Sequence, residues 1–149
     1  MNSHPIKGSS KFDIGFLDSG TTFTYLPREL YNSLLYHMKF FCQNANRYDN
    51  NDTKPNKYCP GGEFSFSRID GEKVACVNFD KQKFENNVKE FFLGYPYITF
   101  HVKQVDGKIG KINWYPSEYF YLAKTGDKYC LAAEEGSDYQ IMFGSTLMR

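Results

Sequence analysis

The sequence lacks the features of a membrane-spanning or nucleic-acid-binding chain. It contains no run of about 18 apolar residues, the length needed to cross a bilayer. Residues 1–10 have no apolar stretch typical of a signal peptide and are interpreted as a polar lead-in. The net charge is +1, without a basic or acidic block, so a nucleic-acid or membrane-surface role has no electrostatic support. We expect no nucleic-acid partner and no membrane segment in this chain.

The spacing typical of a metal site is also missing. The four cysteines form no CxxC pair, and the three histidines are scattered along the chain. We therefore expect no metal and no cofactor. Two disulfides in an oxidising compartment are the favoured interpretation, with free thiols as the alternative. A glycosylation sequon at 51–53 agrees with a protein of the secretory pathway, in the endoplasmic reticulum, in a vacuole or outside the cell. The cysteines concerned are Cys42, Cys59, Cys76 and Cys130.

Short strands and turn signals dominate the 149 residues, a length typical of one domain. Asp70-Gly71 and Asp106-Gly107 predict hairpin turns. Apolar or alternating segments predict strands at 11–17, 22–26, 64–67, 73–77, 97–105, 111–115, 119–122, 129–132 and 140–143. The sequence therefore predicts a mainly β domain over residues 11–149.

Helical spacing is clear in one segment only. Pro27 opens a predicted helix from Arg28 to Cys42, in which the apolar residues recur every three or four positions. Residues 44–57 are polar without periodicity and predict a surface loop. A second, short helix is predicted from Phe84 to Phe92, with its aromatic side chains in the core.

One acid stands directly after a predicted buried strand, in the segment Phe16-Leu17-Asp18-Ser19-Gly20-Thr21-Thr22. Gly20 lets the backbone bend closely around Asp18, and the neighbouring hydroxyls and amides can hydrogen-bond its oxygens. Such a carboxylate can activate a water molecule if a second carboxylate faces it, because the two acids then share one proton. The alternative is that Asp18 only starts a turn or caps a helix. Asp-Ser-Gly by itself favours that alternative, whereas the apolar pair before it and the two threonines after it favour catalysis.

The segment FLDSGTTFTYLPRELY resembles the second active-site loop of the pepsin-like aspartic proteases, with the helix that follows it. Other landmarks of that family follow in the same order. YPYITF at 95–100 resembles the family's LPxIxF strand, WYPSEY at 114–119 its PxxY segment, and KYCL at 128–131 its late cysteine strand. IMFGSTLMR at 141–149 resembles the element that crosses beneath the active-site loop. The cysteine positions and the long Asn-rich insert are similar to those of the plasmepsin V-type proteases of apicomplexan parasites.

The resemblance implies the fold of a C-terminal lobe of a pepsin-like protease over residues 11–149. Asp18 would be the catalytic aspartate of that lobe. Ser19 stands where the family usually has Thr, whose hydroxyl ties the two active-site loops together. Gly20 would form the turn, and Thr21 would hydrogen-bond the outer oxygen of Asp18. The remaining residues implied in loop support are Thr22, Phe143 and Gly144.

A disulfide between Cys76 and Cys130 is also implied, because the family's bridge in this lobe joins a hairpin to the late strand. For the other two cysteines we expect a local bridge from Cys42 to Cys59, which would bracket the flexible loop.

We expect an aspartic endopeptidase that hydrolyses polypeptides by general acid–base activation of water. Its partner would be the N-terminal lobe of the same parent protease, which carries the other aspartate. The chain would be a fragment that stops before the last strands of the family, and it would be inactive alone. One alternative is a non-catalytic binding module of the same fold, and another is a homodimer of retroviral type. Ser145 lies in no GxSxG elbow, so a serine hydrolase is disfavoured.

Overall fold

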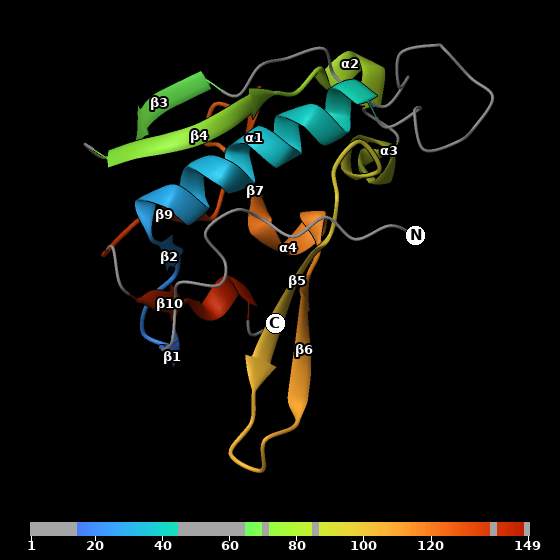
Figure 1. Ribbon diagram of the computed structural model, residues 1–149. Coiled ribbons are helices and arrows are strands. Elements are labelled where there is room, and N and C mark those ends of the chain that lie inside the picture. The colour runs from blue at the N-terminus through green and yellow to red at the C-terminus, as the bar shows by residue number, and fades with distance from the viewer. Residues whose placement is uncertain (1–14, 45–64, 70–71, 85–86, 138–139, 148–149) are drawn as a thin grey trace, which may run out of the picture.

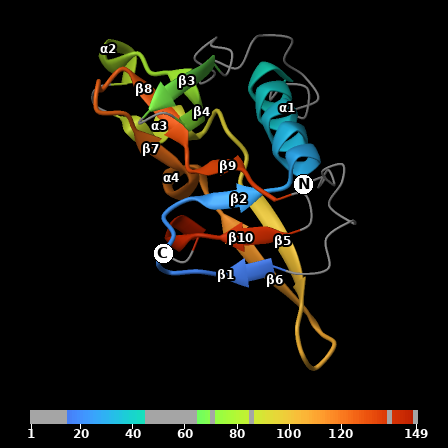
Figure 2. The same ribbon diagram turned by 90° about the vertical axis from the view of Figure 1, so that its left-hand side faces the viewer.

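The computed structural model describes residues 15–44, 65–69, 72–84, 87–137 and 140–147 (Figures 1 and 2). Within these ranges strands predominate, in a four-stranded sheet, a second four-stranded sheet and a separate hairpin. A few helices accompany them. The predicted mainly β class is therefore confirmed. The predicted lead-in at 1–10, most of the loop at 44–57 and the sequon at 51–53 lie outside the described residues.

The first sheet has the order β1-β10-β2-β9. β1 (Gly15–Leu17) runs parallel to β10 (Ile141–Phe143), which is antiparallel to β2 (Thr24–Leu26), and β2 runs parallel to β9 (Ala133–Glu135). β1 and β2 follow one another in the chain but are not neighbours, because β10 lies between them (Figure 2). The segment from residue 18 to residue 23 must therefore pass across the end of β10.

The predicted helix after this segment is confirmed as α1 (Arg28–Asn44). The buried Pro27 directly precedes the helix, and its carbonyl accepts the first helical hydrogen bond from the Tyr31 amide at 2.8 Å. Leu30, Leu34 and Met38 are buried, which matches their spacing of four residues. Packing of this face against the rest of the domain holds the end of β2 and the start of α1 in place.

The second sheet is antiparallel throughout, with the order β3-β4-β8-β7. The predicted hairpin is present, with Ser65 opposite Cys76. The strands of this sheet are β3 (Ser65–Ile69), β4 (Glu72–Asn78), β7 (Phe120–Leu122) and β8 (Lys128–Leu131).

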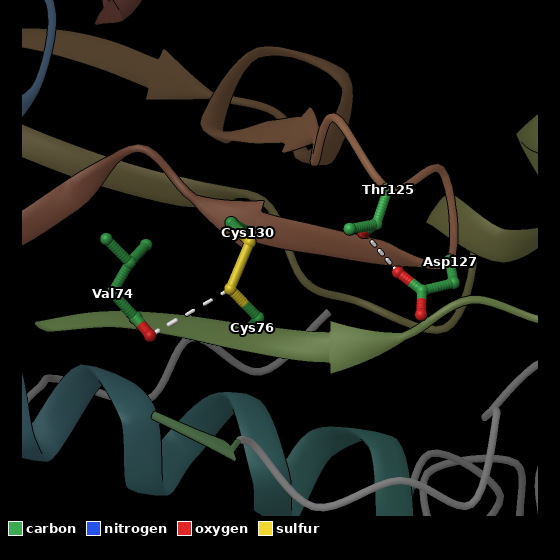
Figure 3. Close-up of a disulfide and its surroundings, with 5 residues drawn as sticks. All are labelled: Val74, Cys76, Thr125, Asp127 and Cys130. Atoms are coloured by element: carbon green, nitrogen blue, oxygen red, sulfur yellow. Dashed lines mark hydrogen bonds between the residues drawn. A yellow bond between two sulfur atoms is a disulfide. The ribbon is translucent and has the colours of Figure 1, made fainter. Parts of the chain in front are cut away.

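The predicted disulfide between Cys76 and Cys130 is confirmed and joins β4 to β8 (Figure 3). The two residues are directly opposite in the antiparallel register, with their Cα atoms 4.0 Å apart. Both are fully buried, and Val74 and Ala123 complete a small apolar cluster with them. The predicted bridge from Cys42 to Cys59 lies outside the described residues.

β5 (Ile98–Lys103) and β6 (Ile109–Trp114) form a two-stranded hairpin that projects from the rest of the molecule in both views (Figures 1 and 2). The predicted turn at Asp106-Gly107 is confirmed. Gly107 has a φ of 82°, which favours glycine, and the Asp106 carboxylate accepts the Lys108 amide at 3.0 Å.

The predicted short helix from Phe84 to Phe92 is corrected to two helices, α2 (Lys81–Phe84) and α3 (Val88–Phe92). The Asp80 carboxylate accepts the amides of residues 82 and 83, so α2 begins before the predicted helix. The sequence interpretation also missed three short elements, which are α4 (Pro116–Tyr119), β9 and the 3₁₀ helix η3 (Ser145–Leu147).

The predicted placement of aromatic side chains in the core is confirmed. Phe84 and Phe91 are buried, and both contact Phe79 ring to ring. Such edge-to-face and stacked contacts add to the free energy gained from burial. The core reaches the first sheet through Phe143, whose ring lies edge-on to Phe100 at 5.0 Å between centroids.

Candidate active site

Asp18 lies at the point where β1 ends and the chain begins to cross β10. Its backbone amide donates to the Phe143 carbonyl at 3.0 Å, which extends the pairing of β1 with β10 by one bond. Backbone pairing with β10 therefore fixes the main chain at Asp18. The expected strand-to-turn junction at Asp18 is confirmed.

Both carboxylate oxygens of Asp18 accept hydrogen bonds from its own loop. The Gly20 amide donates to Oδ1 at 2.9 Å, and the Thr21 hydroxyl donates to Oδ2 at 2.6 Å. The Thr21 amide also donates to the Asp18 carbonyl at 3.2 Å, which closes the turn. The predicted hydrogen bond from the Thr21 hydroxyl to a carboxylate oxygen of Asp18 is therefore present. That this is the outer oxygen of a catalytic pair stays a prediction.

These two donors lower the pKa of Asp18, with the Thr21 hydroxyl as the larger cause and the Gly20 amide as the smaller, while burial acts weakly in the opposite direction. Hydrogen bonds to a carboxylate favour its ionised form. Because the pKa is lower in the folded chain than in the unfolded chain, Asp18 stabilises the fold above its unfolded pKa. This stabilisation is lost as the pH falls through the folded pKa.

The chain that leaves β10 holds the loop from beneath. The Gly144 amide donates to the Thr24 hydroxyl at 3.2 Å, and the Ser145 amide donates to the Thr21 carbonyl at 2.7 Å. The amide of the next residue donates to the Thr22 carbonyl at 3.4 Å. Three successive amides thus hold two points of the loop and the first residue of β2, and Phe143 and Gly144 lie where loop support was predicted. Their roles in catalysis stay a prediction.

Gly144 lies too close to the loop for any side chain. A Cβ atom at this position would lie 2.2 Å from the Phe23 carbonyl oxygen and 2.7 Å from the Thr22 carbonyl oxygen. Both atoms belong to the backbone, so neither can rotate away. Gly144 is therefore required by the close approach of two chain segments.

We expect Gly144→Ala to destabilise the chain by about 1–3 kcal/mol, toward the upper end, because overpacking here displaces backbone. The matched control is Gly110→Ala, whose Cβ would meet the flexible end of the Gln104 side chain at 2.9 Å. Urea unfolding of the two variants measures the difference. Equal unfolding midpoints for Gly144→Ala and the unmodified chain would contradict the close approach.

Ser19 and Thr22 have exposed side chains at the surface of the loop. The role predicted for Ser19 requires a second active-site loop from another lobe, so it stays a prediction. The same holds for the supporting role of the Thr22 side chain, although its carbonyl is held from beneath.

Two residues of the site were missed by the sequence interpretation. Thr24 is fully buried, and its hydroxyl accepts the Gly144 amide. Thr24 and Leu26 are alternate residues of β2 and are buried together. A polar residue that alternates with a core residue in a strand is the signal that could have identified Thr24, because a buried hydroxyl needs a hydrogen-bond partner. The other is Met142, whose Sδ lies 3.8 Å from the Thr21 hydroxyl oxygen. No local pattern marks Met142, because the contact joins residues that are far apart in the sequence.

Apolar side chains are exposed beside the Asp18 loop. The strand before Asp18 was predicted to be buried, and this prediction is wrong for the described chain. Leu17 is 64% exposed and Phe16 is 46% exposed, both on β1, because β1 is an outer strand of its sheet. Within the described chain β1 pairs on one side only, with β10. An exposed apolar group on an outer strand is typical of a surface that another chain segment or domain covers.

The described residues contain no group of three or more His, Cys, Asp or Glu that could hold a metal ion. Among the helices of the described chain, none has the length and apolar character needed to cross a membrane. Compared with known proteins, the chain matches no family model, and a search of curated proteins finds no significant match.

Proposed function

We propose that this chain is one lobe of a pepsin-like aspartic endopeptidase and that Asp18 supplies one of its two catalytic carboxylates. The observation that carries the proposal is the bracing of the Asp18 loop by β10, which lies between β1 and β2. A simple turn needs no such support. The Asp106 carboxylate also accepts the amide two residues ahead, as that of Asp18 does, but Asp106 lies in the turn of the projecting hairpin. A turn with this hydrogen bond therefore forms without the support that β10 gives to the Asp18 loop.

The proposed chemistry requires a second carboxylate. The sequence contains one Asp-Ser-Gly and no Asp-Thr-Gly, so the partner aspartate would come from another lobe. Two facing carboxylates share one proton, and the apparent pKa values then belong to the pair. The ionised member takes a proton from a bound water as the water attacks the peptide carbonyl, while the protonated member donates to the carbonyl oxygen. Water is the nucleophile, so no acyl-enzyme forms.

The exposed apolar residues of β1 support a second lobe as the partner. Phe16 and Leu17 lie directly before Asp18, so a lobe that covered them would bring its own loop close to the carboxylate. Burying these side chains would stabilise the assembled protein by about 25 cal/mol for each Å² removed from water. The buried disulfide between Cys76 and Cys130 supports a place in the secretory pathway.

The test uses the polypeptide in which this chain is joined to a lobe that carries a second Asp-Thr-Gly or Asp-Ser-Gly. We expect it to hydrolyse a polypeptide substrate at acid pH and to be inhibited by a pepstatin-type inhibitor. The 149-residue chain alone is the control and should show no hydrolysis.

Three outcomes separate the alternatives. Hydrolysis by the chain alone, with a dimer in sedimentation, would support a homodimer in which each copy gives one aspartate. Polypeptide binding without hydrolysis by the assembled protein would support a binding module. Hydrolysis that the pepstatin-type inhibitor does not affect would contradict the proposed chemistry.

A further inference from the structure

The Thr21 hydroxyl lies between two possible acceptors. Its oxygen is 2.6 Å from Oδ2 of Asp18 and 3.8 Å from Sδ of Met142. A hydroxyl has one hydrogen to donate, and a carboxylate is a much better acceptor than a thioether sulfur. In the unmodified chain the hydrogen is therefore donated to Asp18.

The position of Met142 is determined by the strands on either side of it. Met142 is the middle residue of β10, opposite Phe16 of β1 and Tyr25 of β2. A chemical change at the sulfur therefore takes place beside Thr21. Any new acceptor formed there competes with Asp18 for the same hydrogen.

Met142 is also the more exposed of the two methionines whose side chains the structure describes. Met142 is 36% exposed, whereas Met38, the other methionine with a described side chain, is 0% exposed. Peroxides oxidise accessible methionine thioethers to sulfoxides, which are polar and carry a good hydrogen-bond acceptor.

We propose that Met142 is an oxidation site at which a peroxide converts the thioether to a sulfoxide, whose oxygen becomes the acceptor of the Thr21 hydroxyl whenever the Asp18 carboxyl is protonated. In this step the O–O bond of hydrogen peroxide breaks and an S–O bond forms. The sulfur loses two electrons, and the other peroxide oxygen leaves as water. The inference concerns this chain alone and does not depend on the proposed peptidase activity.

The consequence is a change in the proton affinity of Asp18. The ionised carboxylate keeps its hydrogen bonds from the Gly20 amide and the Thr21 hydroxyl, because it is a stronger acceptor than the sulfoxide. When Asp18 is protonated, the Thr21 hydroxyl donates to the sulfoxide oxygen instead, which stabilises the protonated form. The loop of Asp18 is otherwise held by backbone bonds, which the oxidation does not break. Oxidation of Met142 would thus change the proton affinity of Asp18 through the Thr21 hydroxyl.

The experiment treats the full 149-residue chain with dilute hydrogen peroxide and locates the sulfoxides by peptide mass mapping. We expect Met142 to be oxidised before Met38. Carbon-detected NMR then follows the Asp18 carboxyl through a pH titration before and after treatment. Because the sulfoxide stabilises only the protonated form, oxidation should raise the pKa of Asp18.

Two variants serve as controls. Met142→Leu keeps the volume but removes the sulfur, so peroxide should leave its Asp18 titration unchanged. Thr21→Val removes the hydroxyl, so its Asp18 pKa should already be raised and should not respond to peroxide. Oxidation of Met38 before Met142 would overturn the proposal. So would an oxidised Met142 with an unchanged Asp18 titration in the unmodified chain.

Discussion

Asp18→Asn in the assembled two-lobe protein should lower kcat for peptide hydrolysis by at least about 10²–10⁴-fold, the contribution typical of general acid–base catalysis. An amide cannot share the proton of a carboxylate pair or take a proton from water. The shape of the side chain is almost unchanged, and its oxygen can still accept the Gly20 amide. The loss should therefore appear mainly in activity, with a smaller drop in the unfolding midpoint because the amide cannot accept both hydrogen bonds.

Asp106→Asn is the matched control for this measurement. Asp106 accepts the amide two residues ahead at 3.0 Å, as Asp18 does at 2.9 Å, so both substitutions disturb the same kind of turn. The Asp106 variant should keep wild-type kcat. If Asp18→Asn also kept it, Asp18 would be a structural residue and the proposed function would be wrong.

Removal of the disulfide is expected to have the largest effect on stability. Cys76 and Cys130 are 54 residues apart in the sequence, and a cross-link of that length stabilises by about 4 kcal/mol in the chain-entropy model. The bridge is buried between β4 and β8 (Figure 3). We expect the double variant Cys76→Ala/Cys130→Ala to unfold at a much lower urea concentration than the unmodified chain.

Reducing agent provides the control for the other cysteines. Added to the double variant, it reports only on Cys42 and Cys59. Added to the unmodified chain, it also opens the bridge between Cys76 and Cys130, while their sulfur atoms remain available for packing. Equal urea midpoints for the double variant and the unmodified chain would mean that this bridge does not stabilise the fold by lowering the conformational entropy of the unfolded chain.

Local patterns in the sequence were sufficient to predict several elements. The spacing of Leu30, Leu34 and Met38 predicted α1, and Asp106-Gly107 predicted the projecting hairpin. These signals succeed because helical periodicity and turn conformation depend on residues a few positions apart. The short elements were harder to predict from the sequence. In the region around α2 and α3, a single apolar stripe did not reveal that Asp80 starts a separate helix.

The hydrogen bonds within the candidate loop could also be predicted from the sequence. Gly20 and Thr21 follow Asp18 closely enough to hydrogen-bond its carboxylate, and both do so. The position of Phe143 and Gly144 beneath the loop was different, because no local signal joins residue 18 to residue 143. That expectation came from a family resemblance.

By itself, then, the sequence determined the mainly β class, the first helix, the hairpins and the immediate hydrogen bonds of Asp18. Tertiary structure alone decided that β10 lies between β1 and β2, that Thr24 accepts the Gly144 amide and that Met142 lies beside Thr21. The physical reason is that each of these contacts joins segments more than 100 residues apart. Their pairing depends on which strands bury their faces together and satisfy their backbone groups, and that choice is made by the whole domain.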